Sequence, residues 1–279
     1  MLENLQICKK ILRSKMQSKQ LFNAKSIPYL CDLIESQKEI LPFDLLGRSL
    51  SYNPYPPRFF EVFPTLLDSV SLDSASLDST SLDSTSPFLD STLLGKLCAL
   101  QIRAFDFADF AHLQSHINAK NVKIIFLDIA RDSVAKPSGE GLECISYLRH
   151  YTDSLIVLKD CFLDSYQILQ AVVFGADALC FSHFSLQSRL KELVDFASHL
   201  GLASLLESQN LADIKNGIFA KVSGFYLLEK CFGELASLIP KRKIICADVE
   251  CVQNLAQHNA KNVSKVLSRV DFVLQDFAL

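Results

Sequence analysis

Short apolar runs alternate with longer amphipathic stretches along most of the chain. The longer stretches space their apolar positions three and four residues apart, which is typical of helices with one buried face. The short runs are partly β-branched, which favours strands buried on both faces. Eight of them are interpreted as strands: Phe43–Leu46, Val122–Leu127, Leu155–Leu158, Ala178–Phe181, Ser204–Leu206, Val222–Leu227, Ile244–Cys246 and Phe272–Leu274. This alternation predicts an α/β protein with a parallel sheet, and eight repeats favour a closed (βα)8 TIM barrel over an open sheet.

The clearest strand–helix–strand repeat begins with the run Leu155–Leu158. Lys159 and Asp160 follow at the carboxyl end of this predicted strand. Over Ser165–Phe174 the apolar spacing becomes helical, and Gly175 stands where a helix stop is expected. The next predicted strand completes a βαβ unit. Reactive groups of TIM barrels stand at the carboxyl ends of strands, which makes Lys159 a candidate for chemistry.

Two segments fall outside this repeat. Residues 1–40 are predicted to form an N-terminal helical extension, and residues 41–279 the barrel domain. Residues 66–92 contain SLDSA, SLDST and SLDST at a period of five, which fits neither a helix nor a strand. Because Ser, Asp and Thr have little surface to bury, this low-complexity segment is interpreted as a flexible surface insertion.

The chain ends shortly after the eighth predicted strand. Leu279 follows the run Phe272–Leu274 closely, so the eighth helix of the barrel is expected to be missing. A barrel without this helix exposes apolar surface on strand eight, unless the N-terminal helices or another subunit cover it. A protein partner or a homo-oligomer is therefore a possible cover for this surface.

Composition and charge narrow the class of protein. With 279 residues and 49% hydrophobic content, the chain can bury a full-size core. The net charge is −3 and no long Lys/Arg cluster occurs, which argues against a nucleic-acid partner. The segment Met1–Gln20 is basic and amphipathic but lacks the apolar core of a signal peptide. No run approaches membrane-spanning length, so no membrane association is expected.

Cysteine and histidine usage argues against disulfides and metal sites. The nine Cys residues form no CxxC pair, and reduced thiols in a cytoplasmic protein are expected. His112 and His116 have the spacing of one helical turn, but no Glu follows His112 as a zinc-protease helix requires. A solvated helix face is the interpretation for this pair, and no metal is expected.

Two groups of residues carry a family resemblance. Lys159–Asp160, Asp164–Ile168 and Gly175–Ala178 read KD, DSYQI and GADA, and His199–Leu202 and Leu205–Glu207 follow at the next predicted strand. This pattern resembles the indole-3-glycerol phosphate synthase family, whose members run close to KDF..DPYQI....GADA and LG....LVE. The resemblance implies a barrel with additional N-terminal helices, a role in tryptophan biosynthesis and no cofactor. The implied reaction is the decarboxylating ring closure of 1-(2-carboxyphenylamino)-1-deoxyribulose 5-phosphate, a phosphorylated small molecule.

The resemblance also implies roles for three residues. Lys159 matches the strand-three Lys of the family, the general acid in ring closure and dehydration, and Glu207 matches its strand-five Glu, an acid–base partner. Arg48 falls where the family has a strand-one Lys, and its guanidinium could bind the substrate carboxylate through two hydrogen bonds. The alternative for Lys159 and Glu207 is an ion pair at the barrel rim. A Lys159→Ala variant is expected to keep its fold, as a rim residue should.

Other positions depart from the family pattern. Leu46 stands where the family has its strand-one Glu, and Val222–Leu228 lacks the amide and guanidinium groups of strand six. Residues 246–250 read CADVE, with Asp248 at the centre, where the family has the strand-seven motif ESGI, and Asp276 and Phe277 stand in place of a Gly-Ser phosphate loop. A carboxylate and a bulky ring oppose a phosphate dianion. Two hypotheses therefore stay open: an active synthase, or an inactive barrel paralogue that serves as a binding or interaction protein.

Overall fold

In the described part of the chain, three helices and a short 3₁₀ turn precede the first strand of the barrel. The computed structural model describes residues 26–73, 97–103, 107, 110–129, 140–182, 189–228, 232–252, 266 and 268–277. The preceding elements are α2 (Ser26–Ile40), α3 (Phe43–Ser49), η2 (Leu50–Tyr52) and α4 (Phe59–Asp73). The division of the chain at residue 40 into an extension and a barrel domain stays a prediction. Two helices beyond that residue, α3 and α4, also come before the first strand.

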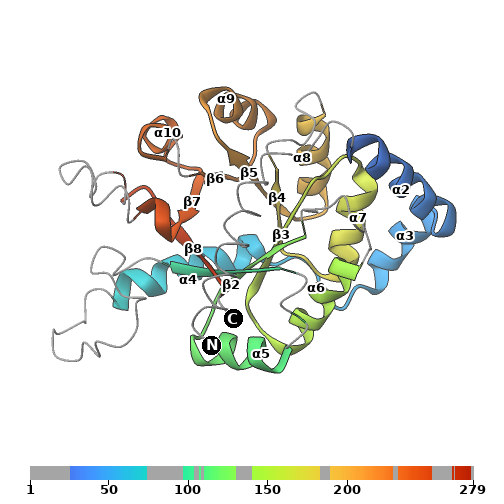
Figure 1. The fold of residues 1–279 in the computed structure, drawn as a ribbon, viewed down its shortest axis with the longest axis horizontal. Coiled ribbons are helices and arrows are strands. Elements are labelled where there is room, and N and C mark those ends of the chain that lie inside the picture. The colour runs from blue at the N-terminus through green and yellow to red at the C-terminus, as the bar shows by residue number, and fades with distance from the viewer. Residues whose placement is uncertain are drawn as a thin grey trace, which may run out of the picture.

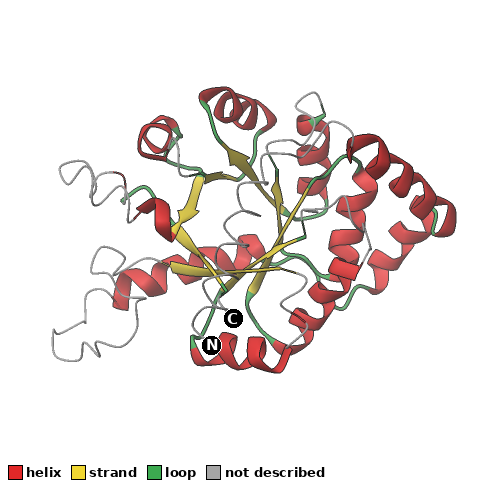
Figure 2. Cartoon of the chain, in the orientation of Figure 1, coloured by secondary structure: helices red, strands yellow, loops and turns green. Residues whose placement is uncertain are grey.

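Eight parallel strands close into a barrel in sequence order. They are β1 (Leu97–Arg103), β2 (Ile124–Asp128), β3 (Leu155–Asp160), β4 (Ala178–Phe181), β5 (Ala203–Ser208), β6 (Gly224–Leu227), β7 (Ile244–Asp248) and β8 (Phe272–Asp276). Each strand pairs with its sequence neighbours, and β8 pairs with β1 to close the sheet. Figure 2 shows these strands at the centre with helices around them. The predicted (βα)8 TIM barrel is confirmed.

The helices that follow the strands cover the outside of the barrel (Figure 1). They are α5 (Phe110–Ala119), α6 (Glu140–Tyr151), α7 (Ser165–Phe174), α8 (Leu190–His199), α9 (Leu211–Ala220) and α10 (Phe232–Leu238). On the outer side of α7 lie α2 and α3, where Leu30, Leu46 and Leu169 share a buried cluster. Within the described part of the chain, no helix has the length and apolar character needed to cross a membrane.

One predicted strand was wrong and one strand was missed. Phe43–Leu46 belongs to α3, which starts directly after Pro42 and has Leu46 as its buried residue. Pro is favoured at a helix start, and one buried position per turn suits a helix on a surface, whereas a barrel strand buries most of its residues. The true first strand is Leu97–Arg103, which is almost fully buried. The other seven predicted runs overlap β2 to β8.

The two faces of the strands build two cores. Inward-facing residues fill the barrel interior, and outward-facing residues pack against the helices. At the amino-terminal end, α4 places Phe59 and Phe63 in the interior core. Their rings stack with centroids 4.8 Å apart, and Phe63 meets Phe272 of β8 edge-on at 5.8 Å. The carboxyl ends of the strands therefore lie at the end of the barrel that α4 does not fill.

Two expectations about segments outside the repeat have different outcomes. Leu66–Asp73, the start of the expected insertion, forms the last turns of α4, and residues 74–92 lie outside the described residues.

On β8, Val273 of the outer face is fully buried. Phe277 follows β8 and lies against His112 and His116 of α5, with ring centroids 5.7 Å and 5.2 Å away. The outer face of strand eight is thus covered at Val273 by other parts of this chain. The face of α5 that carries His112 and His116, which was expected to be solvated, is partly covered by Phe277.

Candidate functional site

Strand alternation turns one polar side chain per strand toward the barrel axis near its carboxyl end. Successive strand residues face opposite sides of a sheet, and Ala99, Phe126 and Val157 belong to the interior core. Residues two positions beyond such interior residues continue the inward face. Together with Tyr226 of the interior core, they form what we name the polar ring: Gln101, Asp128, Lys159, Ser182, Glu207, Tyr226, Asp248 and Asp276. This end of a TIM barrel is where active sites are found.

Lys159 lies between two carboxylates of the polar ring. Its Nζ is 3.0 Å from Oε1 of Glu207 and 3.5 Å from Oδ2 of Asp128. The ammonium also lies 5.1 Å from the centroid of the Tyr226 ring. The side chains of Lys159, Asp128 and Glu207 are only 8–9% exposed, so solvent screens their charges little. Lys159 and Glu207 are thus brought together as a buried pair rather than as an exposed pair at the rim.

The charge state of Lys159 follows from these neighbours. Burial by itself would lower the pKa of Lys159, but Asp128 and Glu207 outweigh burial and hold the pKa well above its ordinary value. Lys159 therefore carries a proton at neutral pH. With a raised pKa the ammonium is a weak acid. A ligand that weakens its contact with a carboxylate would lower this pKa and make Lys159 a better proton donor.

Glu207 is held from two sides. Oε1 accepts from Lys159, while Oε2 accepts a hydrogen bond of 3.1 Å from the hydroxyl of Ser182. Lys159 lies on β3 and Ser182 comes directly after β4, so both partners of Glu207 stand at the carboxyl ends of the two strands that precede β5. The carboxylate has a fixed orientation, which suits a group that exchanges protons with a bound ligand.

The Tyr226 side chain lies inside the barrel near the carboxyl ends of the strands and contacts residues of three other strands. From β6 it donates a hydrogen bond of 2.7 Å to Oδ1 of Asp248 on β7, and its ring lies 6.1 Å from that of Phe126 on β2. Burial and the nearby Asp248 raise the pKa of Tyr226 well above its ordinary value, so the phenol stays protonated. An aromatic ring therefore fills space where the family pattern has hydrogen-bonding groups.

Gln101 and Asp276 pair across the junction of β1 and β8. Nε2 of Gln101 donates to Oδ1 of Asp276 at 2.8 Å. Gln101 is 6% exposed, and its buried Oε1 has no hydrogen-bond partner among the residues that the structure describes. This oxygen is therefore an acceptor that a ligand N–H or O–H group can use.

Arg48 lies outside the polar ring. It stands exposed on α3, in the outer layer of helices, so its interpretation as a strand-one residue was wrong. On the true first strand, Gln101 and Arg103 have the two-residue spacing of the family's strand-one Glu and Lys. Arg103 is half-buried and shares the inward face of Gln101. A guanidinium therefore stands at the position where the family pattern has its Lys, but it belongs to Arg103.

The DSYQI segment fixes the loop that follows Lys159. Asp164 caps α7 by accepting a hydrogen bond from the backbone N–H of Tyr166 at 2.8 Å, in a capping box with Gln167. The Gln167 side chain also accepts from the backbone of Leu163 at 2.7 Å and donates to that of Cys161 at 3.1 Å. Lys159 therefore stands on a strand end whose continuation is held by side-chain hydrogen bonds.

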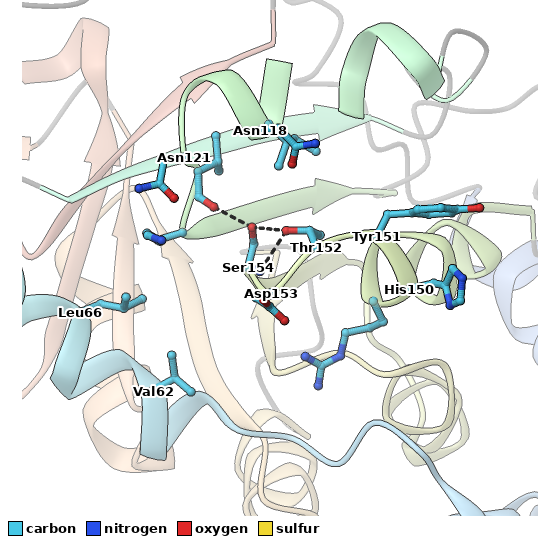
Figure 3. Close-up of a pocket in the computed structure, with 13 residues that line it drawn as sticks. Val62, Leu66, Asn118, Asn121, His150, Tyr151, Thr152, Asp153 and Ser154 are labelled. Carbon is cyan, nitrogen blue, oxygen red and sulfur yellow. Dashed lines mark hydrogen bonds between the residues drawn. The ribbon is translucent and has the colours of Figure 1, made fainter. Parts of the chain in front are cut away.

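A separate pocket of about 560 Å³ lies at the amino-terminal end of the strands. Figure 3 shows its polar wall, where Thr152 and Ser154 share a hydrogen bond of 2.6 Å. Other residues that line it include Val62 and Leu66 of α4, Asn118 of α5 and Asn121 before β2. No residue of the polar ring lines this pocket, so it is distinct from the candidate site.

Sequence reasoning missed Asp128, Ser182 and Tyr226 as members of the site, and also Gln101 and Arg103 of β1. Each could have been found from the inward register of its strand, once the strand ends were known. The expected absence of a metal had no direct test, but among the described residues no three His, Cys, Asp or Glu side chains are grouped as metal ligands.

Known proteins share this sequence pattern. The family described as indole-3-glycerol phosphate synthase matches residues 139–224, which contain both Lys159 and Glu207. A protein named indole-3-glycerol phosphate synthase from Campylobacter concisus (strain 13826) is 30% identical over 226 residues, covering 77% of this chain and 78% of that protein. Another of this name, from Campylobacter jejuni subsp. doylei, is 29% identical over 242 residues, covering 80% and 85%.

Among solved structures, a mutant tryptophan synthase alpha-subunit from the hyperthermophile Pyrococcus furiosus aligns with a TM-score of 0.47 and 14% identity. The alignment covers 64% of this chain and 86% of that one. The barrel assignment rests on the strand pairing of the present chain instead. Sequence identity over most of the length of the Campylobacter concisus protein decides the family: the chain is a divergent member of the indole-3-glycerol phosphate synthase family.

Proposed function

We propose that this protein is an indole-3-glycerol phosphate synthase acting on 1-(2-carboxyphenylamino)-1-deoxyribulose 5-phosphate in tryptophan biosynthesis. The observation that carries the proposal is the buried pair of Lys159 and Glu207, 3.0 Å apart at the carboxyl ends of β3 and β5. Both residues lie in the segment that matches the family. We also propose the cytoplasm as its location, since the cysteines described in the structure form no disulfide.

In this proposal Lys159 is the general acid. A carbon of the aromatic ring bonds to the carbonyl carbon of the substrate, and Lys159 gives a proton to the carbonyl oxygen, which becomes a hydroxyl. The carboxyl group on the attacking carbon leaves as carbon dioxide, and its bonding electrons restore the aromatic ring. Lys159 then takes up a proton from solvent and gives it to the hydroxyl, which leaves as water, and Glu207 accepts the proton that the neighbouring carbon releases as the indole forms.

The substrate carries negative charge on a carboxylate and a phosphate. Arg103 at the end of β1 offers a positive charge on the inward face, and we assign it to the substrate carboxylate in place of Arg48. The unpartnered oxygen of Gln101 can accept a hydrogen bond from a substrate hydroxyl or amine.

A second candidate is an inactive barrel that binds another ligand or a protein partner. The observation that favours it is the position of Tyr226, whose ring lies against Lys159 and whose phenol is bonded to Asp248. Asp276 adds to this, since a carboxylate paired with Gln101 stands in place of the family's phosphate loop. Both features would oppose an anionic substrate at the mouth of the barrel.

The test follows the fluorescence of indole formed from the substrate by the purified protein. The chain contains no Trp, so the product is measured over a low protein background. Lys159→Met keeps the stem of the side chain and removes the proton, and we expect kcat to fall by roughly 10²–10⁴-fold. Circular dichroism verifies that the variant is folded.

Asp153→Asn is the control, because it changes the charge of an exposed residue just before β3, at the opposite end of that strand. Its kcat/KM should stay within about twofold of the unmodified protein. Absence of turnover from folded, unmodified protein would decide for the second candidate.

A further inference from the structure

Asp128 is the second carboxylate of the polar ring beside Lys159, in addition to Glu207. It ends β2 and is register partner to Lys159 on β3. Register partners on neighbouring parallel strands face the same side of the sheet, so the sheet itself holds the carboxylate beside the ammonium. The separation of 3.5 Å and exposures of 8% for both side chains agree with this.

We propose that Asp128 is a positioning residue, which holds the Lys159 ammonium from the β2 side while Glu207 holds it from the β5 side. With both carboxylates in place, Lys159 stays charged and points toward the barrel axis. The catalytic meaning of this arrangement rests on the proposed synthase function. The pairing itself does not, and it can be measured without turnover.

The other groups facing Lys159 leave these two carboxylates as its close ionic partners among the described residues. Burial raises the pKa of both Cys180 and Tyr226, so both are neutral near pH 7. Asp248 accepts from Tyr226, and Asp276 accepts from Gln101. The remaining inward-facing groups are Ser182 after β4, Cys246 of β7 and Arg103 of β1, which is the register partner of Asp128.

The charge balance around Lys159 predicts a specific dependence between the residues. Asp128, Glu207 and Lys159 together carry one negative charge, and Arg103 is the register partner of Asp128 on its other side. Removing Asp128 leaves Lys159 and Glu207 as a neutral pair, whereas removing Lys159 leaves Asp128 and Glu207 without the ammonium between them. The pKa of Lys159 is raised above its ordinary 10.5 in the folded state. The stabilisation it gives is therefore fully present below pH 10.5 and is lost as the pH rises through the raised value.

A double-mutant cycle at pH 7 tests the pairing. Urea unfolding is measured for Asp128→Asn, Lys159→Met, the double variant and the unmodified protein. Asp128→Asn should weaken the unmodified protein more than it weakens Lys159→Met, because only the unmodified protein has the ammonium that Asp128 contacts. The coupling should change the unfolding equilibrium constant by at least about fivefold.

Equal effects of Asp128→Asn in both backgrounds would overturn the proposal, and Asp153→Asn is the control that should show no coupling. If Lys159→Met does not fold, Glu207→Gln serves as the second background. There Asp128 is the last carboxylate beside Lys159, so Asp128→Asn should destabilise more than it does in the unmodified protein. An equal cost would again contradict the proposal.

The pH profile of kcat/KM tests the catalytic meaning. Asp128→Asn should move the basic limb to lower pH, because Lys159 loses one of the two charges that raise its pKa. Asp153→Asn should leave the limb in place. An unmoved limb in Asp128→Asn would overturn the positioning role. Coupling in the cycle without turnover in the unmodified protein would support the pairing and reject the synthase function.

Discussion

Asp177 is fully buried and joins three segments of the chain. Its Oδ1 accepts from the guanidinium of Arg149 on α6 at 3.0 Å and from the backbone N–H of Arg58 before α4 at 3.1 Å. Its Oδ2 accepts from the backbone N–H of Ile156 on β3 at 2.8 Å. The GADA motif that contains Asp177 therefore stabilises the amino-terminal end of the barrel, while Lys159 serves the opposite end.

Replacing Asp177 by Ala should lower the free energy of unfolding by about 3–5 kcal/mol, because the buried guanidinium of Arg149 loses its carboxylate. Chemical denaturation measures the change. Asp153→Ala is the control, since Asp153 is exposed, and should stay within about 0.5 kcal/mol. Similar losses in the two variants would show that the buried ion pair contributes little.

At the same scale, the sequence indicated some members of the site but not others. Lys159 and Glu207 stand in short local motifs, which can be read without knowing the fold. Asp128 and Tyr226 carry no such motif, because their place in the site depends on the register of β2 and β6. Burial also changes one expectation: Lys159 is 8% exposed and paired with two carboxylates, so Lys159→Ala should destabilise the protein rather than leave it unaffected.

Among the elements, α3 and α9 each contain a glycine in a different environment. A Cβ at Gly47 of α3 would meet its nearest atom, Cδ2 of Leu169, at 3.9 Å, which is ordinary contact. A Cβ at Gly217 of α9 would lie 2.5 Å from Cε1 of Phe225 and 3.0 Å from Cδ2 of Leu206. The first glycine leaves room for a side chain, whereas the second lets α9 approach the sheet closely.

Ala substitutions at these two glycines should have opposite effects on stability. Gly47→Ala should stabilise the protein by up to about 1 kcal/mol, because Ala is the better helix former. Gly217→Ala gains the same preference but forces β6 and α9 apart, and should cost about 1–3 kcal/mol net. Urea midpoints of the two variants decide this, and changes of the same sign would contradict the geometry.

Element prediction worked where apolar runs were short and flanked by polar residues. The strands β2 to β8 were found in this way, since a strand buried on both faces has few polar interruptions. The first strand was missed although its apolar run Leu97–Leu100 is as long as Leu155–Leu158, because Phe43–Leu46 was interpreted as strand one. The segment Phe43–Leu46 was misread because a few apolar residues in a row fit a short helix as well as a strand.

The whole molecule is a closed barrel whose amino-terminal end is filled by a helix from outside the βα repeat. The closed architecture could be predicted because the alternation repeats along the chain. The role of α4 could not, since no local pattern says which helix will cover an end of the barrel. Phe63 on α4 is 4% exposed and belongs to the interior core, whereas its neighbour Phe60 is 56% exposed.

Truncating these two rings should separate the filling of the barrel end from the formation of α4 itself. Phe63→Ala removes the ring that stacks on Phe59 and meets Phe272 of β8, and should lower the free energy of unfolding by about 3–5 kcal/mol. Phe60→Ala makes the same chemical change one turn away and should cost less than about 1 kcal/mol. Denaturation followed by far-UV circular dichroism measures both. If Phe63→Ala cost no more than Phe60→Ala, α4 would not be part of the barrel core, whereas the expected difference would mean that the barrel depends on a helix that precedes its first strand.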